Sequence, residues 1–574
     1  MRSLRLPNLL DFRGKLHAPH PHPVSPKPKR SAAERRQRRL HLLAQRTAKR
    51  GRRRQRRKNR HDHAFRHLTR NQQEVAHRLS AGHIDLVTLT GWGFVAHFLA
   101  FLDQVEYCVL LDLEGQGFLR VMIPIARLIL TYHLKILLGI PSMNLVPTKL
   151  FREIALLELI GYTTTQLRSG FCHRGQLAGG PMHQNTLAEA MDKLTAEELA
   201  LLLNGTAQRL VAHGFFAQSK GCFAMDASDL PTPPTYWGAG MVTKTHKKLT
   251  KDKQLVEIAE YVYGFPVFVV DEVHLRLIVA ATVVPIQERE TRHTLALVRQ
   301  AIHNLGPGIL RILLVDRGFL DGVDLWTLKH TLGIDFVVPS KATMHVTEDA
   351  RALARQDAAG ESIVRAERAG LLKPGKDGHE RWEGQVTVVG VAALTSFDQY
   401  GETDHAHAAN RKDFVGNPLN ALVILSWQGD ASPRGEEKVF LTSLPVSSPL
   451  TILDLYDLRS LIENTAFREL KQGWCLESYP KKTEEAVRAH VVLTLLTFTL
   501  ANAFATRNGQ TLAHHGIRRQ RAELQTGKVV LIAGDSYAIF DIEEVFVLLG
   551  ITPTLCFQVD PQQVRKRYGL SSLP

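Results

Sequence analysis

The sequence predicts an α/β protein: a mixed sheet with helices on its faces, preceded by a helical region and a basic, disordered arm. Three observations lead to this prediction. The first 70 residues are strongly basic, apolar residues recur at helical spacing up to about residue 210, and strand and helix patterns alternate from about residue 220. The chain has 574 residues, 44% of them hydrophobic, and this length favours three or more domains.

Residues 1–80 form the predicted arm. Residues 1–70 contain 23 Lys and Arg against 3 Asp and Glu, a net charge of +20, so the remainder carries 49 against 53, a net of −4. Clusters such as residues 52–58 bind polyanions through phosphate neutralisation and counterion release. We therefore expect a nucleic-acid-binding arm. The alternatives are a disordered tail without a partner and extra sequence from an upstream start codon.

The cysteines and the apolar segments indicate the compartment. Five cysteines, an odd number with no CxxC spacing, favour a reduced, intracellular protein. The N-terminus lacks the apolar stretch of a signal peptide. Residues 121–138 are apolar but contain Arg127, His133 and Lys135, which fits buried helices better than a membrane span. We expect a cytoplasmic protein with no membrane partner.

Residues 85–210 form the predicted helical region. Apolar residues recur at helical spacing between residues 150 and 160, and residues 185–203 are rich in Leu, Ala and Glu.

Residues 220–342 predict the first part of the α/β core. The expected elements are a strand ending at Asp226, a hairpin (261–270 and 275–284), a helix (292–305), a strand (309–315) before Asp316, a helix (321–332) and a strand (335–339). This order fits a mixed sheet of the ribonuclease H-like type.

The rest of the chain divides into three parts. Residues 343–450 predict a β-rich insertion, with strand-like runs at 385–394, 421–427 and 439–444. Residues 451–505 return to a helical pattern and predict the helical end of the α/β core. Residues 506–574 form a C-terminal region to which the sequence assigns no role.

Polar residues follow two of the predicted strands and lie on one later helix. Asp226 and Asp316 each end an apolar run, and the ends of adjacent strands are where ligands bind in open α/β sheets. Tyr456, Arg459 and Glu463 are spaced i, i+3, i+7, which places them on one face of a helix.

These residue types suit phosphoryl transfer on a nucleic acid. Three carboxylates can hold two Mg²⁺ or Mn²⁺ ions beside a scissile phosphate, a guanidinium can grip a phosphate in a bidentate fork, and a phenol can stack or donate a hydrogen bond. Carboxylates that meet without a cation repel one another, which should raise at least one pKa.

Each residue also has an ordinary interpretation. An Asp at a strand end is often a turn or cap residue, and Asp229 is the rival of Asp226 for the first acid. Arg459 and Glu463 could form a surface i, i+4 ion pair worth a few tenths of a kcal/mol. A lone Tyr456 is more often a core residue. The three acids in order, each in its own context, favour the joint interpretation.

The residues that flank the three acids resemble the motifs of a known protein family. Asp226 lies in Met-Asp-Ala-Ser-Asp, Asp316 in Leu-Val-Asp-Arg-Gly-Phe, and Glu463 in Tyr456-x2-Arg459-x3-Glu463. Over about residues 150–505 the chain resembles the DDE transposases of bacterial insertion sequences, in the IS-four-like group. A β-rich insertion before the Glu helix is typical of that group.

The resemblance implies a ribonuclease H-like fold and catalytic, metal-binding roles for Asp226, Asp316 and Glu463. It implies dependence on Mg²⁺ or Mn²⁺, with two ions. It implies cut-and-paste strand transfer between double-stranded element ends and target DNA, by a homodimer in the DNA complex. A bacterial protein of this kind would lie on the nucleoid when bound to DNA.

The resemblance also assigns DNA-binding roles. Tyr456 and Arg459 would contact a phosphate or a displaced base. The family's lysine would fall on Leu470, so that Lys471 comes one residue late, a rotation of about 100° on an α-helix. Either the helix breaks locally or Lys471 contacts DNA from another angle.

Two other functions compete with transposition. A ribonuclease H-like nuclease without strand transfer would have the same acids. A non-catalytic DNA-binding protein derived from a transposase would not need them. A two-carboxylate glycosidase would not explain the basic arm.

Overall fold

The computed structural model describes residues 68–111, 123–171, 180–249, 255–288, 290–356, 362–369, 372–374, 380–382, 385–403, 416–427, 437–508, 527–551 and 559–571. Residues Ala64–Pro574 form one compact unit. Residues 1–67, which hold most of the predicted arm, lie outside the described residues.

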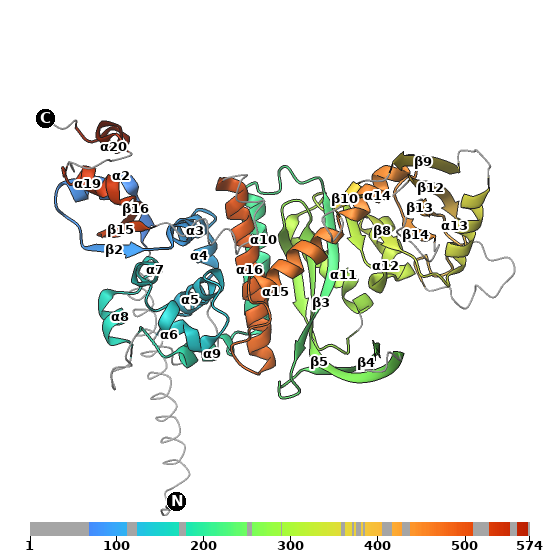
Figure 1. Ribbon diagram of the computed structural model, residues 1–574, viewed down its shortest axis with the longest axis horizontal. Helices are drawn as coiled ribbons and strands as arrows, with labels where there is room; N and C mark the ends of the chain where they lie inside the picture. Colours follow the sequence, from blue (N-terminus) through green and yellow to red (C-terminus); the bar gives the residue numbers. More distant parts are fainter. Residues whose placement is uncertain are drawn as a thin grey trace, which may run out of the picture. The chain divides into compact units, whose positions relative to one another are not determined.

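A four-stranded sheet joins residues from both ends of the chain (Figure 1). Its order is β1-β16-β15-β2, with bounds Thr69–Arg70 (β1), Leu86–Thr90 (β2), Lys528–Ala533 (β15) and Ser536–Phe540 (β16). Three helices pack with it around a separate apolar core: α2 (Gln72–Ser80), α19 (Ile542–Leu548) and α20 (Pro561–Arg567). The C-terminal region therefore completes a sheet that the N-terminal residues begin.

The folded part begins earlier than the sequence predicts. The predicted arm includes residues 68–80, whereas the structure has β1 and α2 there. The α2 residues Val75, Ala76 and Leu79 are buried. The Asn71 side chain accepts a hydrogen bond from the Glu74 N–H at 3.0 Å and caps the helix. The basic arm can therefore extend no further than residue 67.

The described residues between 93 and 212 are mainly helical. Their helices are α3 (Gly93–Gln104), α4 (Tyr107–Leu110), α5 (Ile125–Leu137), α6 (Val146–Lys149), α7 (Ile154–Leu159), α8 (Thr164–Ser169), α9 (Gln184–Met191) and α10 (Ala196–Ala212). Strand β2 lies within residues 85–210, which the sequence predicted to be helical, so the prediction is wrong for these five residues. Every residue of α5 is buried, including Arg127, His133 and Lys135.

A ten-stranded sheet forms the centre of the α/β part. Its order is β4-β5-β3-β7-β8-β14-β13-β12-β9, with β6 paired to β5 off this path. The strands are β3 (Cys222–Thr232), β4 (Gly240–Leu249), β5 (Leu255–Glu272), β6 (Leu277–Val283), β7 (Ile312–Val315), β8 (Asp335–Pro339), β9 (Ile363–Ala369), β12 (Gln385–Leu394), β13 (Leu419–Trp427) and β14 (Lys438–Thr442).

The sheet is mixed in the way the element order predicts. Strands β3, β5 and β6 form an antiparallel meander, whereas β7 and β8 run parallel to β3. Helices α11 (Thr294–Leu305) and α12 (Gly322–Trp326) lie in the connections to β7 and β8. Because β3, β6 and β7 run in the same direction, their carboxyl ends meet at one edge of the sheet.

The β-rich insertion extends this sheet instead of forming a separate one. Strand β14 pairs antiparallel with β8, and β13, β12 and β9 follow in antiparallel order. Helix α13 (His345–Arg355) packs on β12 and β13, and a small hairpin joins β10 (Leu372–Pro374) to β11 (Glu380–Trp382).

The long helix α16 (Glu484–Asn508) packs against both α10 and β6, and also against α5 (Figure 1). Among the described residues it is one helix that is long and apolar enough to cross a membrane, by length and composition only. However, 89% of its most apolar window is buried inside the protein, which is typical of a core helix.

Candidate active site

Asp226 and Asp316 lie where the parallel pairing of two strands ends. Strands β3 and β7 are parallel, and their last register partners are Met225 and Val315. Asp226 and Asp316 are the next residues of the two strands. Asp316 follows the end of β7, as predicted, but β3 continues to Thr232 as a partner of β5, so Asp226 ends only the parallel pairing.

The backbone that carries Tyr456, Arg459 and Glu463 is not the uniform α-helix that the i, i+3, i+7 spacing predicts. Helix α14 (Pro449–Asp457) ends between Tyr456 and Arg459, and a tight turn follows, in which the Arg459 N–H donates to Tyr456 O at 2.9 Å. Glu463 then lies in a π-helical segment, Ile462–Phe467, before α15 (Arg468–Gln472).

Arg459 connects the three acids. Its Nη1 lies 3.1 Å from Asp226 Oδ2. Its Nη2 lies 3.3 Å from Glu463 Oε2 and 3.9 Å from Asp316 Oδ1. The structure thus brings Asp226, Asp316 and Glu463 together around one guanidinium, although they are far apart in sequence.

The exposure of the acids differs. The side chain of Asp226 is 9% exposed, that of Asp316 47% and that of Glu463 62%. The buried Asp226 also accepts a hydrogen bond from the Ala227 N–H at 2.8 Å. Asp226 is therefore fixed on the sheet, whereas Asp316 and Glu463 face solvent.

Burial shifts the pKa of Asp226 more than charge repulsion does. Burial raises this pKa to about 6. The hydrogen bond from the Ala227 N–H and the charge of Arg459 lower it, and the charges of Glu463 and Asp316 raise it by smaller amounts. The raised pKa agrees with the prediction, but repulsion between the acids is not its main cause. Burial lowers the pKa of Arg459, because it disfavours the charged form. Tyr456 and the three acids raise this pKa by more than burial lowers it, so the pKa of Arg459 is raised overall.

Tyr456 packs beside the guanidinium. Its ring centroid lies 5.8 Å from Arg459 Cζ and 4.6 Å from the centroid of the Phe440 ring. Burial raises the pKa of Tyr456 to about 12, so its hydroxyl stays protonated and can donate a hydrogen bond.

The donor set suits a hard divalent cation, because carboxylate oxygens are the ligands that Mg²⁺ and Mn²⁺ prefer. Among the described residues, however, no three His, Cys, Asp or Glu side chains lie close enough together to hold a metal ion. Each predicted acid is turned toward Arg459 instead. The three acids can hold a metal together only if the guanidinium moves out from among them.

Asp229, the rival first acid, has other partners. Its carboxylate forms an ion pair with Lys244, and its backbone oxygen accepts a hydrogen bond from Lys471 Nζ at 2.8 Å. The geometry therefore favours Asp226 over Asp229 as the acid beside Arg459.

The π-helical segment explains the late position of Lys471. A π turn contains one residue more than an α turn, so eight steps from Glu463 to Lys471 rotate the chain about as far as seven α-helical steps. Lys471 therefore lies near the face that Leu470 would occupy on a regular α-helix. There it contacts Asp229 O on β3 and lies 3.2 Å from Glu477 Oε1.

Glu290 is a nearby acid that the sequence reasoning missed. A Cβ added at Gly318 would lie 1.6 Å from Glu290 Oε2, so this carboxylate packs against the turn that follows Asp316. Burial raises the pKa of Glu290, and Asp316 and Asp229 raise it further. The available signal was its place shortly after β6, a strand that runs parallel to β3 and β7 and ends at the same edge.

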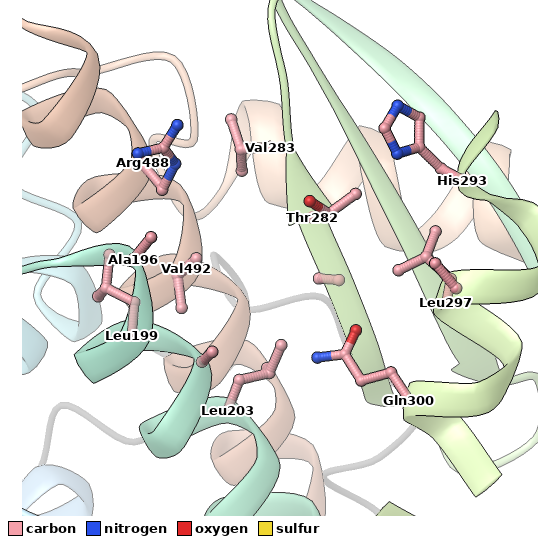
Figure 2. Close-up of a pocket in the computed structure, with 13 residues that line it drawn as sticks. Ala196, Leu199, Leu203, Thr282, Val283, His293, Leu297, Gln300, Arg488 and Val492 are labelled. Carbon is pink, nitrogen blue, oxygen red and sulfur yellow. The ribbon is translucent and has the colours of Figure 1, made fainter. Parts of the chain in front are cut away.

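A cavity of about 330 Å³ lies elsewhere, between α10, β6, α11 and α16 (Figure 2). Its lining is mainly apolar, with Thr282, His293, Gln300 and Arg488 as the larger polar groups. None of the three acids lines it. It is therefore separate from the candidate active site.

Comparison with known protein families gives a match over the central part of the chain. The protein family described as Transposase DDE domain matches residues 217–500, which include all three acids. No curated protein matches the sequence. Among solved structures, the cryo-EM structure of a piggyBac transposase synaptic complex with hairpin DNA is 7% identical, with a TM-score of 0.35 over 84% of this chain and 85% of that chain. A likeness of this degree supports no statement about function.

Proposed function

We propose that this chain is a DDE transposase that cuts DNA at the ends of an insertion sequence and joins them to target DNA, because the family of transposase DDE domains matches its residues 217–500. The observation that carries this proposal is the meeting of Asp226, Asp316 and Glu463 around Arg459. The reaction is a phosphoryl transfer that depends on Mg²⁺ or Mn²⁺.

The strand order supports a ribonuclease H-like core. Three antiparallel strands (β3, β5 and β6) are followed by two that run parallel to the first (β7 and β8), in the spatial order β6-β5-β3-β7-β8. The insertion between β8 and α14 and the Tyr456-x2-Arg459-x3-Glu463 spacing support the narrower assignment to the IS-four-like group.

The acids and Arg459 have complementary roles. Asp226, Asp316 and Glu463 would hold two divalent ions. Such ions would lower the pKa of the attacking hydroxyl and stabilise the leaving oxygen. Arg459 neutralises the acids in the free protein. When the carboxylates hold metal, its guanidinium is free to grip a DNA phosphate in a bidentate fork, with the Tyr456 hydroxyl as a further donor.

The DNA partner is double-stranded: two element ends and a target, bound by a homodimer. The basic arm contacts phosphates, Lys471 contacts the DNA beside the active site, and the helical region is the candidate for specific contacts. The protein acts in the bacterial cytoplasm, on the nucleoid when bound to DNA.

Substitution of the acids tests this function. Asp316→Asn and Glu463→Gln should abolish cleavage of element-end DNA with Mg²⁺ while DNA binding stays near normal, because Lys and Arg make the phosphate contacts. Asp229→Asn is the matched control and should still cleave. If Asp229→Asn abolishes cleavage and Asp226→Asn does not, Asp229 is the first acid.

A second measurement separates transposition from simple hydrolysis. Pre-cut element ends incubated with a supercoiled plasmid should give joined products. Cleavage without joined products would identify a nuclease. Absence of both with intact DNA binding would identify a non-catalytic DNA-binding protein.

A further inference from the structure

The hairpin of β4 and β5 reaches beyond the rest of the sheet. Residues 255–262 of β5 pair only with β4, because β3 pairs with β5 no further than Tyr263 (Figure 1). Strand β4 is an edge strand of the ten-stranded sheet. This two-stranded ribbon and the preceding loop, residues 233–239, are called the β4–β5 ribbon below.

The β4–β5 ribbon exposes large apolar side chains. Trp237 is 75% exposed, Tyr261 66% and Met241 47%. Met241 is the register partner of Tyr263, two residues from Tyr261, so Met241 and Tyr261 lie on the same face of the ribbon. Several exposed apolar side chains on one element are typical of a binding surface.

The loop that carries Trp237 is held in place. The Trp237 N–H donates to Lys482 O at 2.8 Å, and Lys482 Nζ lies 3.4 Å from Thr235 Oγ1. The rings of Tyr236 and Tyr479 meet edge to face with centroids 5.7 Å apart. The exposure of Trp237 is therefore built into a packed loop, whose backbone is hydrogen-bonded to that of the exposed Lys482.

The charge of this segment suits a polyanion. Residues 233–249 contain three Lys and one His and no Asp or Glu. The acids of the neighbouring strand, Glu257 and Glu260, lie opposite Lys247 and Lys244 in the register. The basic residues thus follow the open edge of the sheet. Lysines on an edge strand also prevent sheet-to-sheet aggregation, but that role does not account for an exposed Trp and Tyr.

The ribbon continues from the candidate active site. Lys244 pairs with Asp229, and Lys471 donates to the backbone of the same residue, three positions after Asp226 on β3. Val269, the register partner of Asp226, is eight residues from Tyr261 along β5. At about 3.3 Å per residue, this separation corresponds to roughly 26 Å.

We propose that the β4–β5 ribbon binds the DNA strand that leads away from the active site. Trp237 and Tyr261 stack against its bases or sugars, and Lys482 contacts its phosphates. Aromatic residues interleaved with lysines are the usual means of holding a strand without reading its sequence. This inference rests on the proposed function, since it requires DNA at the three acids.

Tryptophan fluorescence tests the contact directly in the full chain. Among the tryptophans whose side chains the structure describes, Trp237 alone is exposed. Acrylamide should therefore quench the free wild-type protein more than Trp237→Phe. Addition of a gapped DNA duplex, with a short single-stranded stretch, should protect the wild-type signal and leave that of Trp237→Phe nearly unchanged.

Binding of the same duplex provides the second measurement. Trp237→Ala and Tyr261→Ala should each weaken binding about tenfold, whereas Trp237→Phe retains most of the affinity. Leu201→Ala, which removes a side chain that is 64% exposed on α10, is the matched control and should bind as the wild type does.

Three results would overturn or redirect the inference. If Trp237→Ala binds DNA normally and Trp237 stays quenchable in the complex, the ribbon is not a DNA contact, although cleavage by the wild type would keep the proposed function. If Trp237→Ala instead changes the sedimentation of the free protein, the surface joins two copies and the DNA proposal is wrong. If the wild type neither binds nor cleaves DNA, the proposed function itself fails.

Discussion

Arg459 is the residue on which the site depends in the free protein. It lies within 3.1 to 3.9 Å of all three acids, and a cation is what such a group of carboxylates requires. Arg459 therefore acts as the counter-ion of the three carboxylates in the protein without metal. The sequence predicted Arg459 as a phosphate ligand, and the structure adds its contacts with all three acids.

Arg459→Ala should lower the free energy of unfolding by about 2 kcal/mol, because it leaves the buried Asp226 without its charged partner. It should also make the protein more responsive to divalent cations. The increase in Tm on adding Mg²⁺ should be larger for Arg459→Ala than for the wild type. Arg468→Ala, an exposed arginine on α15, is the control. An equal response in all three proteins would mean that Arg459 does not compete with a metal.

A second unusual residue is Lys135, which is fully buried in α5. Among the described residues no group accepts a hydrogen bond from its Nζ, which lies 5.2 Å from the centroid of the Tyr132 ring. Burial lowers the pKa of Lys135 to about 8 from 10.5. The charged ammonium of Lys135 therefore lowers the free energy of unfolding, because it loses its hydration only in the folded state.

The pH dependence of Lys135→Met follows from this shift. Between pH 8 and 10.5 the unfolded state binds more protons than the folded state, so the lysine's destabilisation is full below pH 8 and is lost as the pH rises. Lys135→Met should thus be more stable than the wild type at pH 7, by on the order of 3 kcal/mol. Urea unfolding at several pH values measures the difference. An advantage that stays constant up to pH 10.5 would contradict the assignment.

At the scale of elements, the sequence predicted most of the α/β core. The hairpin, α11, β7 and β8 all lie near their predicted positions, because apolar runs and turn residues mark them locally. It could not predict that β14 continues the sheet from β8, or that residues 528–540 pair with residues 69–90, because strand partners are chosen by long-range packing. The late position of Lys471 predicted a local break of the helix as one of two alternatives, but no local residue pattern identified this break as a π-helical segment.

The π-helical segment makes a specific prediction. If it accommodates one extra residue, deletion of Thr465 should convert it to an α turn and leave α15 in register, with Lys471 still near Asp229. The deletion should shift Tm by only a few degrees. Deletion of Thr494 from the regular helix α16 rotates the following residues by about 100° and should prevent folding. Thermal unfolding of both variants measures this. Equal damage would show that the π turn has no spare residue.

At the scale of the whole molecule, the positive charge is concentrated in the N-terminal residues, and the rest of the chain is slightly acidic. The arm carries most of the positive charge, and the structure limits it to residues 1–67. Phosphate contacts position a protein on DNA without reading its sequence. The contribution of the arm to DNA affinity should therefore be measurable apart from the sequence preference of the rest of the protein.

Deletion of residues 1–67 leaves β1 intact and removes 22 Lys and Arg against 3 Asp and Glu. If the arm neutralises about eight phosphates, the slope of log affinity against log salt should flatten by roughly seven units. Preference for element ends over random DNA should change little. An unchanged slope would mean that the arm is a tail without a DNA contact, and a lost preference would mean that the arm carries recognition.

A change of ligand atom tests whether Asp226, Asp316 and Glu463 bind metal themselves. Thiolates favour softer ions over Mg²⁺, whereas carboxylates accept both Mg²⁺ and Mn²⁺. The wild type should cleave element-end DNA with either ion. Asp226→Cys, Asp316→Cys and Glu463→Cys should be inactive with Mg²⁺ and regain cleavage with Mn²⁺, while Asp229→Cys should behave as the wild type. Cleavage with Mg²⁺ by the three cysteine variants, or a switch of ion only at Asp229, would show that these three acids are not the metal ligands.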